Sequence, residues 1–221
     1  MKRLFLLILL ATLTPALADD PPVPNLMFSG RGTQGGVARA FLSRQLYALG
    51  QANKDALTVL NAARLTASVT LLDTPRAHET SGNSALITAP DPITAAQMFD
   101  TAAALATAND ALLDLVDASR REASFAPLTA AVSSTSSLDG GQTDTWQVPF
   151  FGASLAELAI LGDGASNLDL KIMDENANPV CQDIGPSDTA YCSFYPTRNG
   201  MFLITVINTG SGANTYVLLT N

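Results

Sequence analysis

The spacing of apolar residues changes once along this 221-residue chain, and that change restricts the fold more than any other feature. Early in the chain, Val37, Phe41 and Leu49 belong to a series at three- and four-residue spacing, which is the period of an amphipathic helix. Later, Trp146 and Val148 belong to an alternating series, which is the period of a strand. The sequence therefore predicts an α+β chain in two domains: an N-terminal four-helix unit made of two helical hairpins, followed by a C-terminal antiparallel β-sandwich.

The helical domain is expected over residues 36–125. Its first helix should end at Gly50, because glycine favours helix ends, and a second amphipathic helix is expected over residues 55–72. Residues 48–57 resemble residues 104–112, with one inserted residue, and both segments place an Asn and an Asp at a helix junction. Such residues cap the free amides of the following helix, so the repeat predicts two similar hairpins. The alternative interpretation is chance similarity within an alanine-rich sequence.

The second hairpin is expected to follow a loop at residues 76–90, which is rich in turn-forming residues. Asp91 followed by Pro92 predicts the start of the third helix, since aspartate caps helices and proline is tolerated in the first turn. The fourth helix should end near Arg120 and Arg121, because basic residues are favourable at a helix C-terminus.

Three further segments complete the division of the chain. Residues 19–35 are predicted to form a flexible arm, and residues 126–142, rich in Ser, Thr and Gly, a linker. Residues 143–221 combine alternating strands with regularly spaced turn signals, which predicts six to eight strands of a β-sandwich.

The first 18 residues have the pattern of a secretory signal peptide. Lys2 and Arg3 precede an apolar stretch, and Ala16-Leu17-Ala18 supplies the small-residue cleavage site. The uncharged stretch is shorter than the roughly 20 residues needed to span a bilayer, so cleavage after Ala18 is preferred over an uncleaved anchor. We therefore expect a periplasmic or secreted bacterial protein with no membrane span after signal cleavage.

Two cysteines, Cys181 and Cys192, are separated by ten residues. In an oxidising compartment a structural disulfide is the expected state of such a pair, and a catalytic or free thiol is the alternative.

Acidic residues outnumber basic ones, and the formal net charge is −8. Beyond Pro127 there are nine acids against only Lys171 and Arg198. This balance argues against nucleic acid as a partner, since phosphate binding needs clustered Lys and Arg. Hard oxygen ligands suit Ca²⁺, and the candidate calcium ligands are the carboxylates near two turns: Asp163, Asp169 and Asp174. Solvated turns, in which Asp and Asn bond to the local backbone, are the alternative. No other cofactor is indicated.

Five short segments in the second half resemble the bacterial pre-peptidase C-terminal domain, a β-sandwich appended to exported enzymes, over roughly residues 143–220. The segments are 146–150, 167–172, 176–180, 199–206 and 216–218. Asn167 stands where the family motif has Asp, and the cysteine pair is additional. The resemblance implies a fold and an exported setting, and calcium binding in some members, but it does not imply an activity.

Two candidate catalytic features are weak. Residues 30–35 match the pattern G-x-G-x-x-G, but a proline-rich arm precedes them where a dinucleotide site needs a buried strand. His78 is the only histidine, and its polar surroundings predict a solvated loop residue. Without a recognisable catalytic set, the sequence predicts a non-enzymatic interaction protein of the bacterial envelope that binds a protein or an envelope polymer. The alternatives are an accessory polymer- or substrate-binding module of a secreted hydrolase system, and an unrecognised hydrolase.

Overall fold

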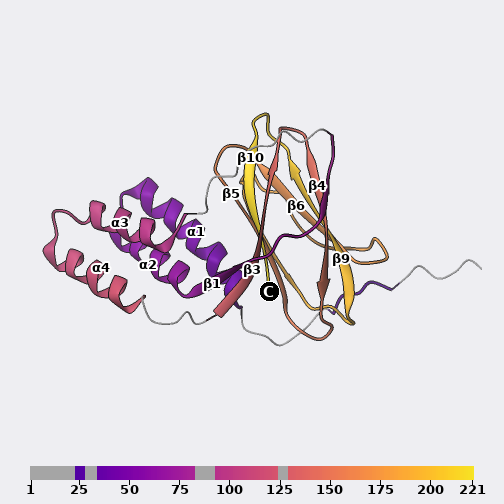
Figure 1. Cartoon of the computed structure of the whole chain (residues 1–221), viewed down its shortest axis with the longest axis horizontal. Helices are drawn as coiled ribbons and strands as arrows, with labels where there is room; N and C mark the ends of the chain where they lie inside the picture. Colours follow the sequence, from indigo (N-terminus) through magenta and orange to yellow (C-terminus); the bar gives the residue numbers. More distant parts are fainter. Residues whose placement is uncertain (1–22, 28–33, 83–92, 124–128) are drawn as a thin grey trace, which may run out of the picture.

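The computed structural model describes residues 23–27, 34–82, 93–123 and 129–221. These residues form an α+β protein in which helices lie to one side of a β-sandwich (Figure 1). The predicted signal segment, residues 1–18, and the predicted cap at Asp91 lie outside the described residues. Within the described residues, no helix is long and apolar enough to span a membrane.

The described helices come in two pairs, as predicted. Their bounds are α1 (Gly36–Asn53), α2 (Ala56–Ala67), α3 (Ala95–Leu105) and α4 (Asp110–Glu122). Asp55 caps α2 by accepting hydrogen bonds from the amides of Leu57 and Thr58, and Asn109 caps α4. Thr94 caps α3 in a capping box with Gln97, which places the start of this helix three residues after the predicted Pro92.

Two helix ends differ from the expectation. Helix α1 continues past Gly50 to Asn53, and the next residue, Lys54, caps it in a left-handed conformation with φ of 53°. Gly50 serves close packing instead, because a Cβ there would lie 2.6 Å from Cγ2 of Val59 on α2. Helix α2 ends at Ala67, before the predicted Leu72. The β-branched pair Val69-Thr70 opens a strand whose pairing partner lies far away in the sequence.

Two five-stranded sheets form the sandwich. We call the first the helix-side sheet; its order is β1 (Val69–Asp73), β3 (Thr129–Leu138), β10 (Asn214–Thr220), β5 (Ala156–Gly162) and β8 (Thr189–Phe194). The second is the far sheet; its order is β2 (His78–Thr80), β4 (Thr143–Phe150), β9 (Gly200–Asn208), β6 (Leu168–Met173) and β7 (Pro179–Asp183). All pairs are antiparallel except β1 with β3, which is parallel. The main core fills the space between the sheets and includes Trp146, Leu170, Phe202 and Tyr216.

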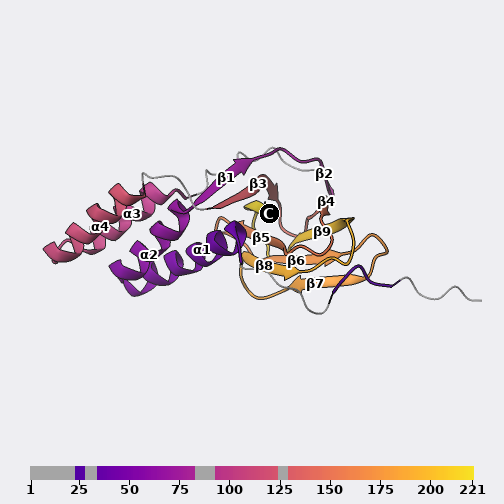
Figure 2. The ribbon, with the colours of Figure 1, turned by 90° about the horizontal axis from the view of Figure 1, so that it is seen from below.

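Helix α1 covers the outer face of the helix-side sheet. Val37 and Ala40 share a buried cluster with Ala159 on β5 and with Val217 and Leu219 on β10. Every residue of β10 is buried, because one face of the strand packs on the main core and the other lies under α1. Three layers therefore follow one another: helix, helix-side sheet and far sheet (Figure 2).

The two sheets are connected to each other at both edges of the sandwich. At one edge, β1 joins the helix-side sheet and β2, a few residues later, joins the far sheet. We call residues 69–80 the strap, because this segment crosses from one sheet to the other. At the opposite edge, β7 and β8 belong to different sheets, and the Cys181–Cys192 disulfide links them.

The described parts of three segments predicted as arm, loop and linker belong to the sandwich. Residues 126–142, predicted as a linker, contain β3, which lies inside the helix-side sheet. The strand is rich in Ser and Ala, and its Ala131 packs in the same buried cluster as Val37 and Ala40 of α1. Within the predicted arm, Asn25 is fully buried, and Met27 forms an isolated bridge with Tyr195. The predicted loop at residues 76–90 contributes β2.

Candidate functional site

A cavity of about 330 Å³ lies between the helices and the helix-side sheet. Its apolar lining includes Ala40, Val69, Ile93, Met98, Leu161 and Val217. Its polar lining includes Ser43, Arg44, Thr66 and Asp163. This volume falls at the lower end of the range of small-molecule pockets, which are typically concave and mainly apolar with a few polar groups.

The cavity exists because α1 belongs to two separate cores. Val37 and Ala40, near its start, pack on the sheet. Leu46, further along, packs on the helical core. Ser43 and Arg44 lie on the turn between these two contacts, and both line the cavity. The helix thus bridges the two cores at the place where they do not fill the space between them.

The start of α1 lies very close to the sheet because its first residue, Gly36, has no side chain. A Cβ at Gly36 would lie 2.4 Å from the carbonyl oxygen of Ala130 on β3. A larger residue at this position would push the helix away from the strand and change the width of the cavity.

A buried carboxylate from the sheet anchors the same end of α1. Glu157 on β5 is 1% exposed, and its Oε2 accepts a hydrogen bond from the backbone N–H of Gly35 at 2.7 Å. Gly35 is the N-cap residue and has no side chain to do this. Glu157 Oε1 accepts the hydroxyl of Tyr191 at 2.8 Å. The carboxylate therefore sits at the positive end of the helix dipole.

The hydrogen bond to Glu157 accounts for the last glycine of the G-x-G-x-x-G pattern, Gly35. In a nucleotide site, the helix N-terminus that follows such a pattern binds phosphate. Here the N–H of Gly35, the last glycine of the pattern, donates to the protein's own Glu157, while most of the pattern, residues 30–33, lies outside the described residues.

Arg44 provides the cationic group of the cavity. Its Nη2 donates to the carbonyl oxygen of Gly162 at 2.9 Å. Burial lowers the pKa of the Arg44 guanidinium, and the charge of Asp188 opposes that shift. Among the described residues, no carboxylate lies within 4 Å of the Arg44 guanidinium. Since arginine stays protonated in proteins, Arg44 places a positive charge in the cavity wall, while Asp163 contributes a carboxylate to the same lining.

A short polar network lies beside it. The hydroxyls of Ser43 and Thr66 hydrogen bond to each other, and Thr66 Oγ1 donates to Sδ of Met98 at 3.2 Å. Ser43 is 1% exposed. These groups connect α1, α2 and α3 behind the cavity and give its wall a polar spot with both donor and acceptor capacity.

The three candidate calcium ligands are not brought together. Asp163 precedes β6 and Asp174 follows it, and a six-residue strand spans about 20 Å. Asp163 accepts the amides of Ala165 and Thr215, and Asp169 accepts from the side chain of Asn167. Within the described parts of the chain, no three His, Cys, Asp or Glu side chains are placed to hold a metal.

Asp174 organises the turn after β6. Its carboxylate accepts hydrogen bonds from the amides of Asn25, Asn176 and Asn178, at 2.7, 2.9 and 2.9 Å, and from the side chain of Asn178 at 3.0 Å. Burial raises the pKa of Asp174, but these hydrogen bonds outweigh it, so the pKa lies below its usual value. The carboxylate thus holds the turn together by bonding to the local backbone.

His78 differs from the solvated loop residue expected from the sequence. It lies on β2 opposite Trp146, and the two rings stack with centroids 4.0 Å apart. Its Nε2 is 3.0 Å from Oγ of Ser136 and 3.8 Å from Oδ1 of Asp144. The pairing of β2 with β4 buries most of the side chain, because it places the imidazole over the indole.

Beneath His78, a buried polar chain links the two sheets. Asp144 is fully buried and accepts the hydroxyl of Tyr216 at 2.6 Å; it also accepts the hydroxyl of Thr80. The indole N–H of Trp146 donates to the Tyr216 oxygen at 2.8 Å. Burial, with the charge and hydrogen bond of Asp144, raises the pKa of Tyr216. Each of these polar groups has a hydrogen-bond partner, so together these side chains hold the strap to the core.

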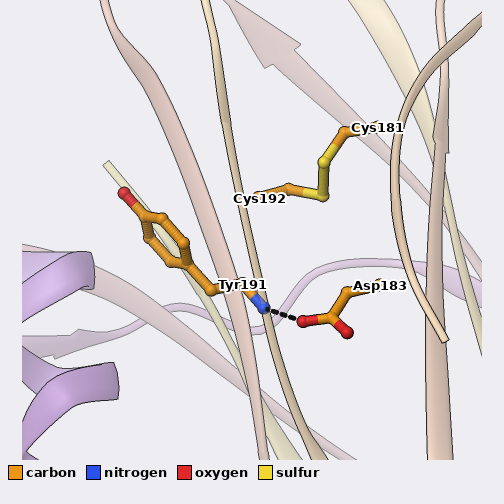
Figure 3. The surroundings of a disulfide bond; sticks show 4 residues. All are labelled: Cys181, Asp183, Tyr191 and Cys192. Atoms are coloured by element: carbon orange, nitrogen blue, oxygen red, sulfur yellow. Dashed lines mark hydrogen bonds between the residues drawn. A yellow bond between two sulfur atoms is a disulfide. The ribbon is translucent and has the colours of Figure 1, made fainter. Parts of the chain in front are cut away.

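The predicted disulfide is confirmed. Cys181 and Cys192 are bonded, with their Cα atoms 6.1 Å apart. Figure 3 shows the neighbouring side chain of Tyr191 directed away from the disulfide, towards the helices, while its backbone N–H donates to Asp183. The Tyr191 ring stacks on Phe41 of α1, with centroids 5.3 Å apart. Adjacent residues of β8 thus link the far sheet on one side and the helix on the other.

Sequence reasoning did not identify Arg44, Ser43 or Glu157 as site residues. Arg44 and Ser43 lie within the apolar series of α1 and look like ordinary helix residues. Glu157 offered a usable signal, because it is a lone acid inside the apolar run of β5, and a charged residue in a buried strand needs a specific partner.

The comparisons with known proteins are distant. No protein-family model matches the chain, and a search of curated proteins finds no match. A pre-peptidase C-terminal domain of a collagenase from Bacillus anthracis is similar, with 18% identity and a TM-score of 0.34 over 40% of this chain and 87% of that chain. This is the family that residues 143–220 resemble in sequence, and the C-terminal half is a β-sandwich like it.

Two other solved structures are also similar over part of the chain. The Yersinia pseudotuberculosis-derived mitogen has 13% identity and a TM-score of 0.29, over 41% of this chain and 84% of that chain. The C-terminal CBM6 of LamC, from Zobellia galactanivorans, has 12% identity and a TM-score of 0.27, over 38% and 75% of the two chains. These similarities, with low identities and low TM-scores, concern only part of the fold.

Proposed function

We propose that this protein is an exported binding protein that holds a small, largely apolar molecule in the cavity between α1 and the helix-side sheet. The cavity itself carries the proposal, because it combines a ligand-sized volume, an apolar wall and a few fixed polar groups. It also lies between the two halves of the chain, which is a common place for ligand sites.

The cavity volume sets the scale of the ligand. At about 330 Å³ the cavity is at the lower end of the range of small-molecule pockets, so we take a fatty alcohol or acid of about eight carbons as the probe. The cavity is partly open to solvent, so this volume describes the part of a ligand held against the lining and does not exclude a longer molecule.

Nuclear magnetic resonance can test the site directly. Titration with 1-octanol should move the methyl signals of Val69, Leu161 and Val217, which line the cavity, and leave those of Leu170 in the main core unchanged. Absence of any shift with a panel of apolar molecules of eight to twelve atoms, or shifts confined to residues away from the cavity, would contradict the proposal.

Binding rather than catalysis is also proposed, and the surroundings of His78 support it. In a Ser-His-Asp arrangement, the Asp and the Ser contact different ring nitrogens. Here Ser136 and Asp144 both face Nε2, and Nδ1 lies 3.4 Å from the carbonyl of Arg76. A screen of the purified protein against peptide, ester and glycoside substrates tests this; turnover removed by His78→Ala or by a carboxylate substitution would establish an enzyme instead.

A second candidate function is an interaction with a protein partner through the helices. Large apolar side chains are about half exposed there: Leu42 and Leu49 on α1, Leu57 on α2 and Leu115 on α4. A pull-down from the envelope fraction tests this idea. A specific partner retained by the wild type and lost by Leu42→Gln with Leu49→Gln supports it, and equal recovery by both proteins counts against a helical interface.

The proposed location is the periplasm or the external medium. The disulfide supports it, because disulfides persist in oxidising compartments. Fractionation of the producing cells, with N-terminal sequencing of the protein recovered, should find a chain that starts at Asp19 outside the cytoplasm. A full-length cytoplasmic chain would contradict export.

A further inference from the structure

We infer that the ligand of this cavity is a monoanionic amphiphile, with a carboxylate head at Arg44 and an apolar body of about eight carbons against the sheet. This inference rests on the proposed function, since it names the ligand class of the same cavity. The first observation is that the positive charge of Arg44 is partly buried and that the protein balances it only in part. The guanidinium of Arg44 has one hydrogen bond, to the carbonyl of Gly162, and no carboxylate of the described residues within 4 Å.

The nearby acids already have other partners. Asp163 lines the same cavity, but its two oxygens accept the amides of Ala165 and Thr215. Asp188 acts on Arg44 only through its longer-range charge, and its Oδ2 accepts the amide of Gly164. A buried cation is favourable only when it is paired and hydrogen bonded, so a ligand anion would complete the pairing that the protein leaves open.

Charge and shape limit the anion further. The carboxylates of Asp163 and Asp188 lie nearby, and their negative charge disfavours a dianion such as a phosphate monoester more than a monoanion. Arginine presents parallel N–H donors that match a carboxylate. The lining from β1 is apolar, with Val69 and Leu71, and β10 contributes Val217 beside Thr215 and Tyr216. The apolar part of this lining suits an alkyl or aromatic body.

Octanoate and 1-octanol form a matched pair of probes, because they differ mainly in the charge of the head. In calorimetric titration of the purified protein, octanoate should bind at least tenfold more tightly than 1-octanol. Arg44→Gln should weaken octanoate binding tenfold to a hundredfold, as expected for loss of a hydrogen-bonded charge pair, and should leave 1-octanol within twofold.

Two further variants make the outcome interpretable. Arg39→Gln changes the same residue type on the same helix outside the cavity lining, and its octanoate affinity should stay within twofold of the wild type. Leu71→Trp places a larger side chain at the cavity wall, from an edge strand where Leu71 is 42% exposed, and should weaken both probes. Circular dichroism and thermal melting of each variant establish that it is folded.

The outcomes separate the two proposals. Equal affinity for octanoate and 1-octanol, unaffected by Arg44→Gln but reduced by Leu71→Trp, would overturn the carboxylate inference and retain the cavity as a ligand site. Binding of neither probe, or binding unchanged by Leu71→Trp, would overturn the inference together with the proposed function.

Discussion

Replacing Glu157 with Gln tests whether the sheet anchors α1. Gln has nearly the same shape, so Glu157→Gln removes the charge without creating a cavity. The carboxylate accepts the N–H of Gly35 and the hydroxyl of Tyr191. An amide has a single acceptor oxygen, so it can keep the bond to Gly35 while its NH₂ group faces the Tyr191 oxygen, which must rotate its proton away.

The expected cost follows from these contacts. Hydrogen bonds to charged groups contribute about 1.5–3 kcal/mol and are about twice as strong as neutral ones, so each of the two bonds loses about 1 kcal/mol. Loss of the negative charge at the helix N-terminus adds about 0.5 kcal/mol. We therefore expect the free energy of unfolding to fall by about 2–3 kcal/mol. Tyr191→Phe, which removes the whole of one hydrogen bond to the carboxylate, should cost about 1.5–3 kcal/mol.

Urea denaturation followed by circular dichroism measures the loss, and hydrogen exchange localises it. Amides of the first turns of α1 should exchange faster in Glu157→Gln. The pKa of Tyr191, raised by burial and then by the hydrogen bond and charge of Glu157, should fall in the variant while burial still holds it above its usual value. Glu122→Gln, at an exposed position on α4, serves as the control and should change stability by less than 0.5 kcal/mol. A stability of Glu157→Gln equal to that of this control, with unchanged α1 protection, would refute the anchoring role.

Three other predictions concern stability. Replacing both Cys181 and Cys192 with Ser should lower the free energy of unfolding in urea by about 2–4 kcal/mol, and a loss under 1 kcal/mol would show that the disulfide is not needed to hold the two sheet edges. Because the pKa of Asp174 is lower in the folded protein than in the unfolded chain, its stabilisation should be complete above the unfolded pKa and lost as pH falls through the folded pKa; Asp174→Asn should flatten this acid dependence in denaturation curves between pH 7 and pH 2, and an unchanged slope would contradict it. Gly50→Ala should destabilise the protein by about 1–3 kcal/mol in thermal or urea melts despite the better helix propensity of alanine, because its Cβ would lie 2.6 Å from Val59; a gain in stability would contradict the close packing of α1 and α2.

The sequence predicted features that depend on local chemistry. The cap at Asp55, the hairpin pattern and the strands around Trp146 and Leu170 followed from residue type and spacing. It failed where distant contacts decide the outcome. Residues 69–72 continue a helical pattern, yet they form β1, because β3, about 60 residues later, provides a parallel partner.

Strand β3 is a second segment whose structure depends on distant contacts. Its run of Ser and Ala looked like a linker because it lacks the large apolar residues of a typical strand. The close approach of helix and strand is made possible from the helix side, because a Cβ at Gly36 of α1 would lie 2.4 Å from the carbonyl oxygen of Ala130 on β3. The cavity was equally inaccessible to sequence reasoning, since its lining comes from helices and strands far apart in the chain.

The position of the cavity gives ligand binding a mechanical consequence. Helix α1 contributes Val37 to the sheet cluster and Leu46 to the helical cluster, and the cavity lies beside the turn that joins these contacts. A ligand there would contact both halves of the molecule and would fill space that neither core fills alone. Because binding stabilises only the state that forms the cavity, a saturating ligand should raise the melting temperature of helices and sandwich together. Separate melting of the two halves, with only one of them shifted by the ligand, would show that α1 does not couple them.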